Sequence, residues 1–193
     1  MPKIFFAFIF IAFTSAQAQQ SQKYADALGK YQEAIQFYDQ NQFEIASKTF
    51  REIYSEIESD QLKANIDYYI AKCAIELGKP KADELMERFI ANNPTSLKTN
   101  KAYLEVGNYY FQNKDFNKAN EWLSQVNTSS LSRDELKTYQ FNYGYTNFRT
   151  KNYRKAQQLF DNVRNDKEYG AQAKYYIAFI AYFRNFGIKT PCF

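Results

Sequence analysis

The chain has 193 residues, 24% of them charged, and its formal net charge is only +4 at pH 7. This length fits one domain, or a repeat array that behaves as one, and the lysines and arginines are scattered among acidic residues, so we expect no nucleic-acid partner. Histidine is absent, and the sequence has no glycine-rich phosphate loop, nucleophile motif or metal-ligand spacing, so we expect a protein that is not an enzyme and holds no cofactor or metal.

Residues 1–18 predict a secretory signal peptide. Lys3 supplies a positive start, residues 4–13 form an unbroken apolar run, and residues 16–18 read Ala-Gln-Ala, a typical cleavage site. The run is too short to span a bilayer, which takes about 20 helical residues, and no cysteine follows it for lipid attachment. We expect cleavage after Ala18 and a periplasmic or secreted product with no stable membrane span. An uncleaved amphipathic anchor is less favoured, because the run is apolar on every face.

Residues 19–165 predict an array of helical hairpins. In the clearest copy, residues 101–126, a first helical face carries Tyr103, Gly107 and Tyr110, and a second apolar face follows a polar break. The small Gly107 allows the two helix backbones to approach closely. The same pattern predicts hairpins at about residues 24–57, 63–91, 98–127 and 132–165.

Small residues recur at matching positions of these hairpins. The second helices carry Ala46, Ala82, Ala119 and Ala156, which lie 36 or 37 residues apart. The first helices carry Ala34, Ala71, Gly107 and Gly144, and an aromatic residue follows the turn at Phe43, Phe116 and Tyr153. A fixed period of this length indicates a stacked array of repeats.

At these positions the chain resembles the tetratricopeptide repeat family, whose unit is two antiparallel helices of about 34 residues. The resemblance covers about residues 24–182 and implies an all-α, right-handed superhelical array of about four helix-turn-helix repeats. Two departures stand out: the period is slightly longer than the consensus, and Lys79 and Pro80 replace the turn aromatic of the second hairpin. We expect that hairpin to be locally less regular.

Helix-capping residues predict where two of the first helices begin. Thr95 or Ser96 is the expected N-cap of the helix that contains Tyr103. Ser132 and Glu135 have the spacing of a capping box that opens the fourth hairpin.

Residues 166–193 predict an incomplete fifth repeat and an irregular tail. A helix with the apolar pattern of a first helix begins at Ala171, but Gly187 and Pro191 break it and no second apolar face follows. Since repeat arrays usually end in a polar capping helix, we expect this helix to keep an unpartnered face. Three alternatives stay open: another protein covers it, the chain self-associates through it, or the chain is the N-terminal fragment of a longer repeat protein.

The two cysteines do not form a disulfide framework. We interpret Cys73 as a small buried hydrophobic residue, and a bridge from Cys73 to Cys192 has no support in the sequence.

In the tetratricopeptide repeat family the first helices line a concave groove that binds partners. By that resemblance the groove would be lined by Tyr31, Tyr38, Tyr68, Lys72, Asn108, Phe111, Phe141, Tyr145 and Phe148, with Tyr175 and Phe179 as further candidates. Phe141, Tyr145 and Phe148 follow one helical stripe. Packing between helices is the competing interpretation for each ring.

The residue types of this groove favour a particular class of partner. Some members of the family clamp a C-terminal carboxylate with basic and amide side chains, but only Lys72, Asn108 and Arg149 could serve here, so the clamp pattern is not satisfied. An aromatic groove favours an extended apolar peptide or an amphipathic helix. We therefore expect a non-catalytic scaffold of the cell envelope that binds another envelope protein; carbohydrate binding is the alternative.

Overall fold

The computed structural model describes residues 22–186, and the chain divides into two compact units, Met1–Ser96 and Leu97–Phe193. The predicted signal peptide and Cys192 lie outside the described residues. Within residues 22–186 the regular structure is helical, without strands. No described helix is both long and apolar enough to cross a membrane.

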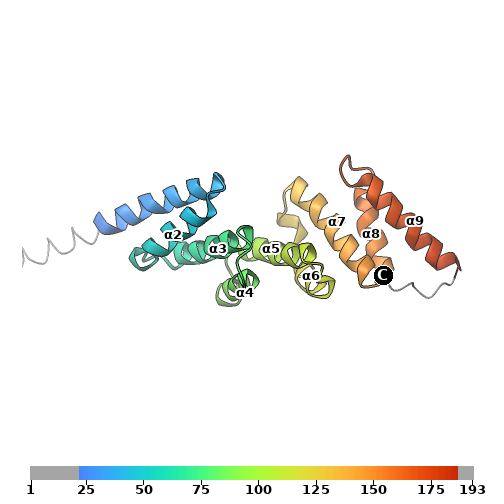
Figure 1. The fold of residues 1–193 in the computed structure, drawn as a ribbon, viewed down its shortest axis with the longest axis horizontal. Helices are drawn as coiled ribbons and strands as arrows, with labels where there is room; N and C mark the ends of the chain where they lie inside the picture. Colours follow the sequence, from blue (N-terminus) through green and yellow to red (C-terminus); the bar gives the residue numbers. More distant parts are fainter. Residues whose placement is uncertain (1–21, 187–193) are drawn as a thin grey trace, which may run out of the picture. The chain divides into compact units, whose positions relative to one another are not determined.

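The first unit contains two helical hairpins (Figure 1). A helix of residues 22–39 is followed by α2 (Phe43–Ile53), the short 3-10 helix η1 (Tyr54–Glu56), α3 (Asp60–Glu76) and α4 (Ala82–Asn92). The 22–39 helix and α2 form the first pair, and α3 and α4 form the second.

The second unit contains two more hairpins and a further helix (Figure 1). Its elements are α5 (Thr99–Gln112), α6 (Phe116–Leu123), the 3-10 helix η2 (Thr128–Ser130), α7 (Arg133–Arg149), α8 (Tyr153–Val163) and α9 (Gly170–Phe186). Within residues 22–186 no second helix follows α9. The predicted fold class is confirmed for the described residues: an all-α series of about four helix-turn-helix repeats followed by one further helix, α9.

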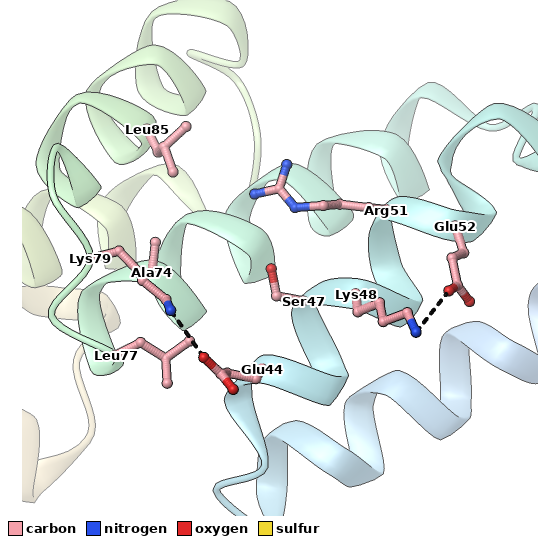
Figure 2. A pocket seen from close by; sticks show the side chains of 9 residues that line it. All are labelled: Glu44, Ser47, Lys48, Arg51, Glu52, Ala74, Leu77, Lys79 and Leu85. Carbon is pink, nitrogen blue, oxygen red and sulfur yellow. Dashed lines mark hydrogen bonds and ion pairs between the residues drawn. The ribbon is translucent and has the colours of Figure 1, made fainter.

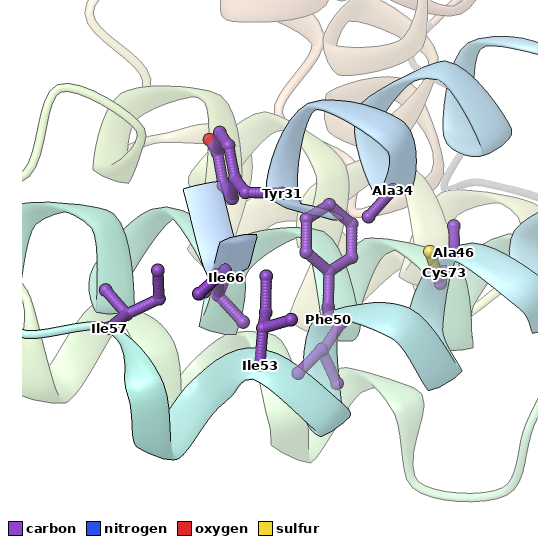
Figure 3. Packing of buried hydrophobic residues seen from close by; sticks show 10 residues of the cluster. Tyr31, Ala34, Ala46, Phe50, Ile53, Ile57, Ile66 and Cys73 are labelled. Atoms are coloured by element: carbon purple, nitrogen blue, oxygen red, sulfur yellow. The ribbon is translucent and has the colours of Figure 1, made fainter. Parts of the chain in front are cut away.

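The repeated small residues lie where helices pack against each other. All four second-helix alanines are fully buried, and so are Ala34 and, to within 1% of its surface, Ala71. Of these, Ala34 and Ala46 belong to a core of the first unit with Phe50 and Ile53 of α2 (Figure 3). A larger side chain at any of these positions would push the helices apart.

Gly107 and Gly144 show this close packing most directly. A Cβ atom built on Gly107 would lie 2.6 Å from Cγ and Cδ2 of Leu123 on α6. A Cβ atom on Gly144 would lie 3.0 Å from a ring carbon of Phe160 on α8. A side chain at Gly107 would overlap the second helix, as the sequence predicted, and one at Gly144 would be in unusually tight contact with it.

The turns inside the hairpins share one hydrogen-bonded motif. After α7, the backbone N–H of Lys151 donates to the carbonyl of Phe148 (3.1 Å), and the N–H of Asn152 donates to the carbonyl of Asn147 (2.8 Å). This is the Schellman pattern, which places one residue in the left-handed region. The residues with positive φ at this position are Asn41, Gly78, Lys114 and Lys151.

The second hairpin is less regular than the others, as predicted. It makes the same bonded turn at Gly78 but then adds residues before α4 begins, and Lys81 is a second left-handed residue with φ of 61°. Pro80 has no N–H to donate, which suits a lengthened turn better than a helix interior. The hairpin keeps the repeat geometry and differs at its tip.

One capping prediction is confirmed and one is wrong. Ser132 Oγ accepts the N–H of Glu135 (3.3 Å), and the Glu135 carboxylate accepts the N–H of Ser132 (2.9 Å), which completes the capping box. Helix α5, in contrast, begins at Thr99 behind Lys98 rather than behind Thr95 or Ser96. A turn that bonds the N–H of Ser96 to the carbonyl of Asn93 (3.1 Å) occupies the segment where the cap was expected.

Cys73 is buried in the core of the first unit, in agreement with its interpretation as a hydrophobic residue (Figure 3). Burial raises the pKa of its thiol to about 11. The thiol therefore stays protonated at neutral pH, and in this form it is a poor nucleophile.

Candidate functional site

Half-buried aromatic rings form a continuous set on the second unit. Its members come from α5, α6, α7 and α9, and we call them the aromatic strip: Phe111, Phe116, Tyr145, Phe148, Tyr176 and Phe179. Each keeps part of its ring accessible, in contrast to the fully buried rings of the core.

The strip begins on the third hairpin. The ring of Tyr145 on α7 has centroid distances of 5.8 Å to Phe111 and 5.5 Å to Phe116, both in edge-to-face geometry. Phe111 and Phe116 also contact each other across the turn of their hairpin, at 6.1 Å. Edge-to-face pairs at these separations stabilise one another beyond the area they bury.

The strip continues from α7 to α9. The ring of Phe148 lies 5.0 Å from Tyr176 and 5.7 Å from Phe179, and Tyr145 lies 5.2 Å from Tyr176. Mutual packing fixes these rings, so little side-chain entropy remains to be lost when something binds to them. Burial is the main reason that the pKa of Tyr176 is raised.

Arg149 adds a positive charge to this aromatic surface. Its guanidinium carbon lies 4.5 Å from the ring centroid of Phe116, and its Nη1 donates a hydrogen bond to the hydroxyl of Tyr145 (3.1 Å). The side chain is exposed. A guanidinium held over aromatic faces is ready to pair with a carboxylate or a backbone carbonyl.

Helix α9 contributes an exposed edge beside the strip. Tyr175, which contacts Phe179 with stacked rings at 6.1 Å, exposes 62% of its surface, and Tyr182 exposes 50%. The opposite face of α9 packs inward through buried Ala173 and Ile180. Among the described residues, the exposed edge of α9 therefore carries the large side chains of Tyr175 and Tyr182.

Three of the predicted groove residues, Phe111, Tyr145 and Phe148, lie together in the strip, and so does the further candidate Phe179. Asn108 lies nearby in α5, where its side-chain oxygen accepts a hydrogen bond from Asn142 of α7 (3.1 Å). This hydrogen bond joins α5 and α7, the first helices of the third and fourth hairpins. Whether these residues bind a partner stays a prediction.

Three other predicted groove residues are in the core. Tyr31 exposes 8% of its surface and packs against Phe50, and Phe141 exposes 8% and packs against Phe160. Tyr68 exposes 2% and contacts Phe89. They lie three residues before the small residue of their helix, a position that faces the second helix, so packing between helices is the interpretation that holds for these rings.

The remaining two candidates belong to the first unit. Tyr38 is half-buried between Phe43 (5.4 Å) and Tyr69 (5.2 Å). Lys72 lies 3.7 Å from the Glu76 carboxylate on the same helix. The first unit thus repeats part of the aromatic arrangement with fewer rings.

Sequence reasoning missed Phe116 and Tyr176 as parts of the exposed strip. The sequence pattern identifies Phe116 only as the aromatic residue after a turn, and it places Tyr176 only within the incomplete fifth repeat. The useful signal for Phe116 is the aromatic residue four positions after Ala34, Gly107 and Gly144. In these three hairpins it contacts the aromatic residue after the turn: Tyr38 with Phe43, Phe111 with Phe116, and Phe148 with Tyr153.

A pocket of about 540 Å³ lies in the first unit between α2, α3 and α4 (Figure 2). Its apolar part comes from Ala74, Leu77 and Leu85. Its carboxylates already have partners, since Glu44 pairs with Lys79 at 3.0 Å and Glu52 with Lys48 at 3.9 Å. The lining charges of this pocket largely neutralise one another.

A second pocket, of about 520 Å³, lies in the second unit, and we call it the basic pocket. It is lined by Lys151, Asn152, Tyr153, Arg154, Gln157 and Arg184. This lining contains three cations and no carboxylate. Among the described residues, no group of histidine, cysteine or acidic side chains is arranged to hold a metal ion.

Comparison with known proteins supports the fold. No family model matches the chain, and no curated protein matches its sequence. Among solved structures, MamA (AMB-1), a protein that contains tetratricopeptide repeats, matches with a TM-score of 0.65 and 16% sequence identity over 84% of each chain. The chain is therefore similar to MamA in its tetratricopeptide-like helical fold.

Proposed function

We propose that the protein is a non-catalytic scaffold that binds another protein through the aromatic strip of its second unit. The observation that carries this proposal is the strip itself: six packed, half-buried rings, two of which lie under the exposed Arg149. Tyrosine, tryptophan and arginine contribute most often to the energy of protein interfaces, and phenylalanine is enriched in them as well. The repeat fold, shared with MamA, supports the same class of function.

The chemistry of the strip favours an apolar polypeptide as its partner. Fixed rings offer flat apolar surface to an extended peptide or to one face of an amphipathic helix. Arg149 can also hydrogen-bond a carbonyl or carboxylate of that partner. The sole tryptophan, Trp122, packs against Tyr103 at 6.0 Å and is half-buried, so nothing specific favours a sugar ligand.

The compartment that we propose is the cell envelope, as a periplasmic or secreted protein. Support comes from the sequence of residues 1–18, with its charged start, apolar run and Ala-Gln-Ala site.

Affinity purification from the cells of origin tests this function. The protein would carry either two changes beside the strip, Arg149→Ser with Tyr175→Ser (the strip variant), or two control changes on α8, Lys155→Ser with Gln158→Ser. All four side chains are exposed, so both variants should fold, which circular dichroism would verify. We expect the wild type and the α8 control to retain a partner protein that the strip variant loses. Equal retention by all three would contradict the proposal.

A further inference from the structure

The basic pocket carries positive charge that no acidic side chain of its lining neutralises. Arg184 makes a long contact with a neutral oxygen, from its Nη1 to Oε1 of Gln157 (3.5 Å). Lys151 and Arg154 are exposed cations on the other side of the same pocket. Among the ion pairs formed within residues 22–186, none involves these three side chains.

The pocket of the first unit is a useful contrast. It has a similar volume, yet its two carboxylates pair with two of its three cations. The basic pocket lacks such internal partners, so its cations lower the free energy of an anion that enters it. The first turn of α8 begins at Tyr153, and its partial positive charge has the same sign.

Tyr153 connects this pocket to the aromatic strip. Its ring lies 5.8 Å from the ring of Phe148 in the strip, and it stacks with Phe183 of α9 at 6.3 Å. Phe183 in turn contacts Phe179 of the strip at 4.5 Å. The basic pocket and the strip are therefore contiguous at Tyr153, which lines the pocket and contacts Phe148.

We infer that the basic pocket binds a carboxylate of the polypeptide that occupies the aromatic strip. The partner segment would then carry apolar residues followed by one or more aspartate or glutamate side chains. The planar guanidinium groups of Arg154 and Arg184 suit a carboxylate, which they can engage with two parallel hydrogen bonds. This inference rests on the proposed function, because it assumes that a peptide lies on the strip.

Two fluorescent probe peptides test the inference with the full chain. Both carry phenylalanine and leucine residues; one ends in two aspartates and the other in two asparagines, each with an amidated C-terminus. We expect the wild type to bind the aspartate probe roughly tenfold more tightly, which corresponds to about 1.4 kcal/mol. The ratio should fall to about one in the Arg154→Gln, Arg184→Gln variant, because its pocket has lost two cations.

A control variant distinguishes the loss of the pocket's cations from the loss of net positive charge. Lys167→Gln with Lys174→Gln removes the same charge from exposed positions outside the pocket lining and should keep the tenfold ratio. If the double variant Arg154→Gln, Arg184→Gln still binds the aspartate probe more tightly than the asparagine probe, the inference is overturned.

The remaining outcomes distinguish this inference from the proposed function. If both probes bind equally, and both are weakened by Arg149→Ser with Tyr175→Ser, the strip binds peptides and the carboxylate site is wrong. If neither probe binds the wild type, both the carboxylate site and the apolar peptide partner are contradicted.

Discussion

Single residues decide how closely the helices of each hairpin approach. A Cβ atom would overlap Leu123 at Gly107 and would contact Phe160 tightly at Gly144, whereas a Cβ atom on the exposed Gly29 would have no atom within 4 Å. A side chain would therefore crowd the neighbouring helix at Gly107 but would meet no other group at Gly29. Only the positions under a second helix are packing requirements.

Gly107→Ala should destabilise the protein by about 1–3 kcal/mol, because the new methyl group overlaps Leu123, whose backbone nitrogen is also only 3.2 Å away. Gly29→Ala is the matched control. It lies in an exposed helix position and should be neutral or stabilising by up to about 1 kcal/mol. Urea unfolding followed by circular dichroism measures both. Equal tolerance of alanine at the two sites would contradict the close helix contact.

Cys73 should resist thiol reagents while the first unit is folded. Its side chain is fully buried and its thiol pKa is about 11, and the thiolate is the reactive form. In a Cys192→Ser background at pH 8, we expect labelling by Ellman's reagent to be roughly 100-fold slower than in urea. Immediate labelling of the native protein would show that the core around Cys73 is open.

At the scale of elements, the capping box fixes the start of α7. Ser132→Ala removes the hydroxyl that accepts the N–H of Glu135 and should cost about 1 kcal/mol of stability. Urea unfolding measures this loss. A change within error would mean that the cap contributes nothing to the second unit.

The same box predicts how acid affects stability. The pKa of Glu135 is held below its usual value, mainly because its carboxylate accepts a hydrogen bond from the backbone N–H of Ser132. The hydrogen bond with the Ser132 side chain and the Lys101 ammonium, 3.2 Å away, lower the pKa further. A carboxyl with a lowered folded pKa stabilises the fold above its unfolded pKa, near 4.5, and this stability is lost as the pH falls through the folded pKa. Glu135→Gln can keep the hydrogen bond but does not titrate, so it should lose less stability than the wild type between about pH 5 and pH 3. Urea unfolding of the two proteins at each pH measures this difference. An equal or larger loss of stability in Glu135→Gln would contradict the prediction.

The sequence predicted these elements well where one local rule decides. The 36- or 37-residue spacing of alanines located the hairpins, and the Ser132 to Glu135 spacing located the start of α7. The start of α5 was missed because two rules competed: Thr95 and Ser96 are good caps, but the turn after Asn93 uses that segment. A list of capping residues does not reveal which of two turns forms.

At the scale of the whole molecule, the candidate site was harder to predict than the fold. Helical periodicity places a residue on a face of its own helix, but exposure depends on which other helices cover that face. Tyr31 and Phe141 therefore ended in the core, while Phe148, on the same predicted stripe as Phe141, lies in the strip. The basic pocket joins a turn to the distant Arg184, a proximity that no spacing in the sequence indicates.

The central claim is that the aromatic strip is a partner-binding surface, and site-specific photo-crosslinking in the cells of origin tests it most directly. A benzophenone amino acid would replace Tyr175 beside the strip or, as control, the exposed Gln158 on α8. We predict that one dominant protein is crosslinked from position 175 and not from position 158. Identical adducts from both positions, or none from position 175 in a chain shown to be folded, would contradict the claim.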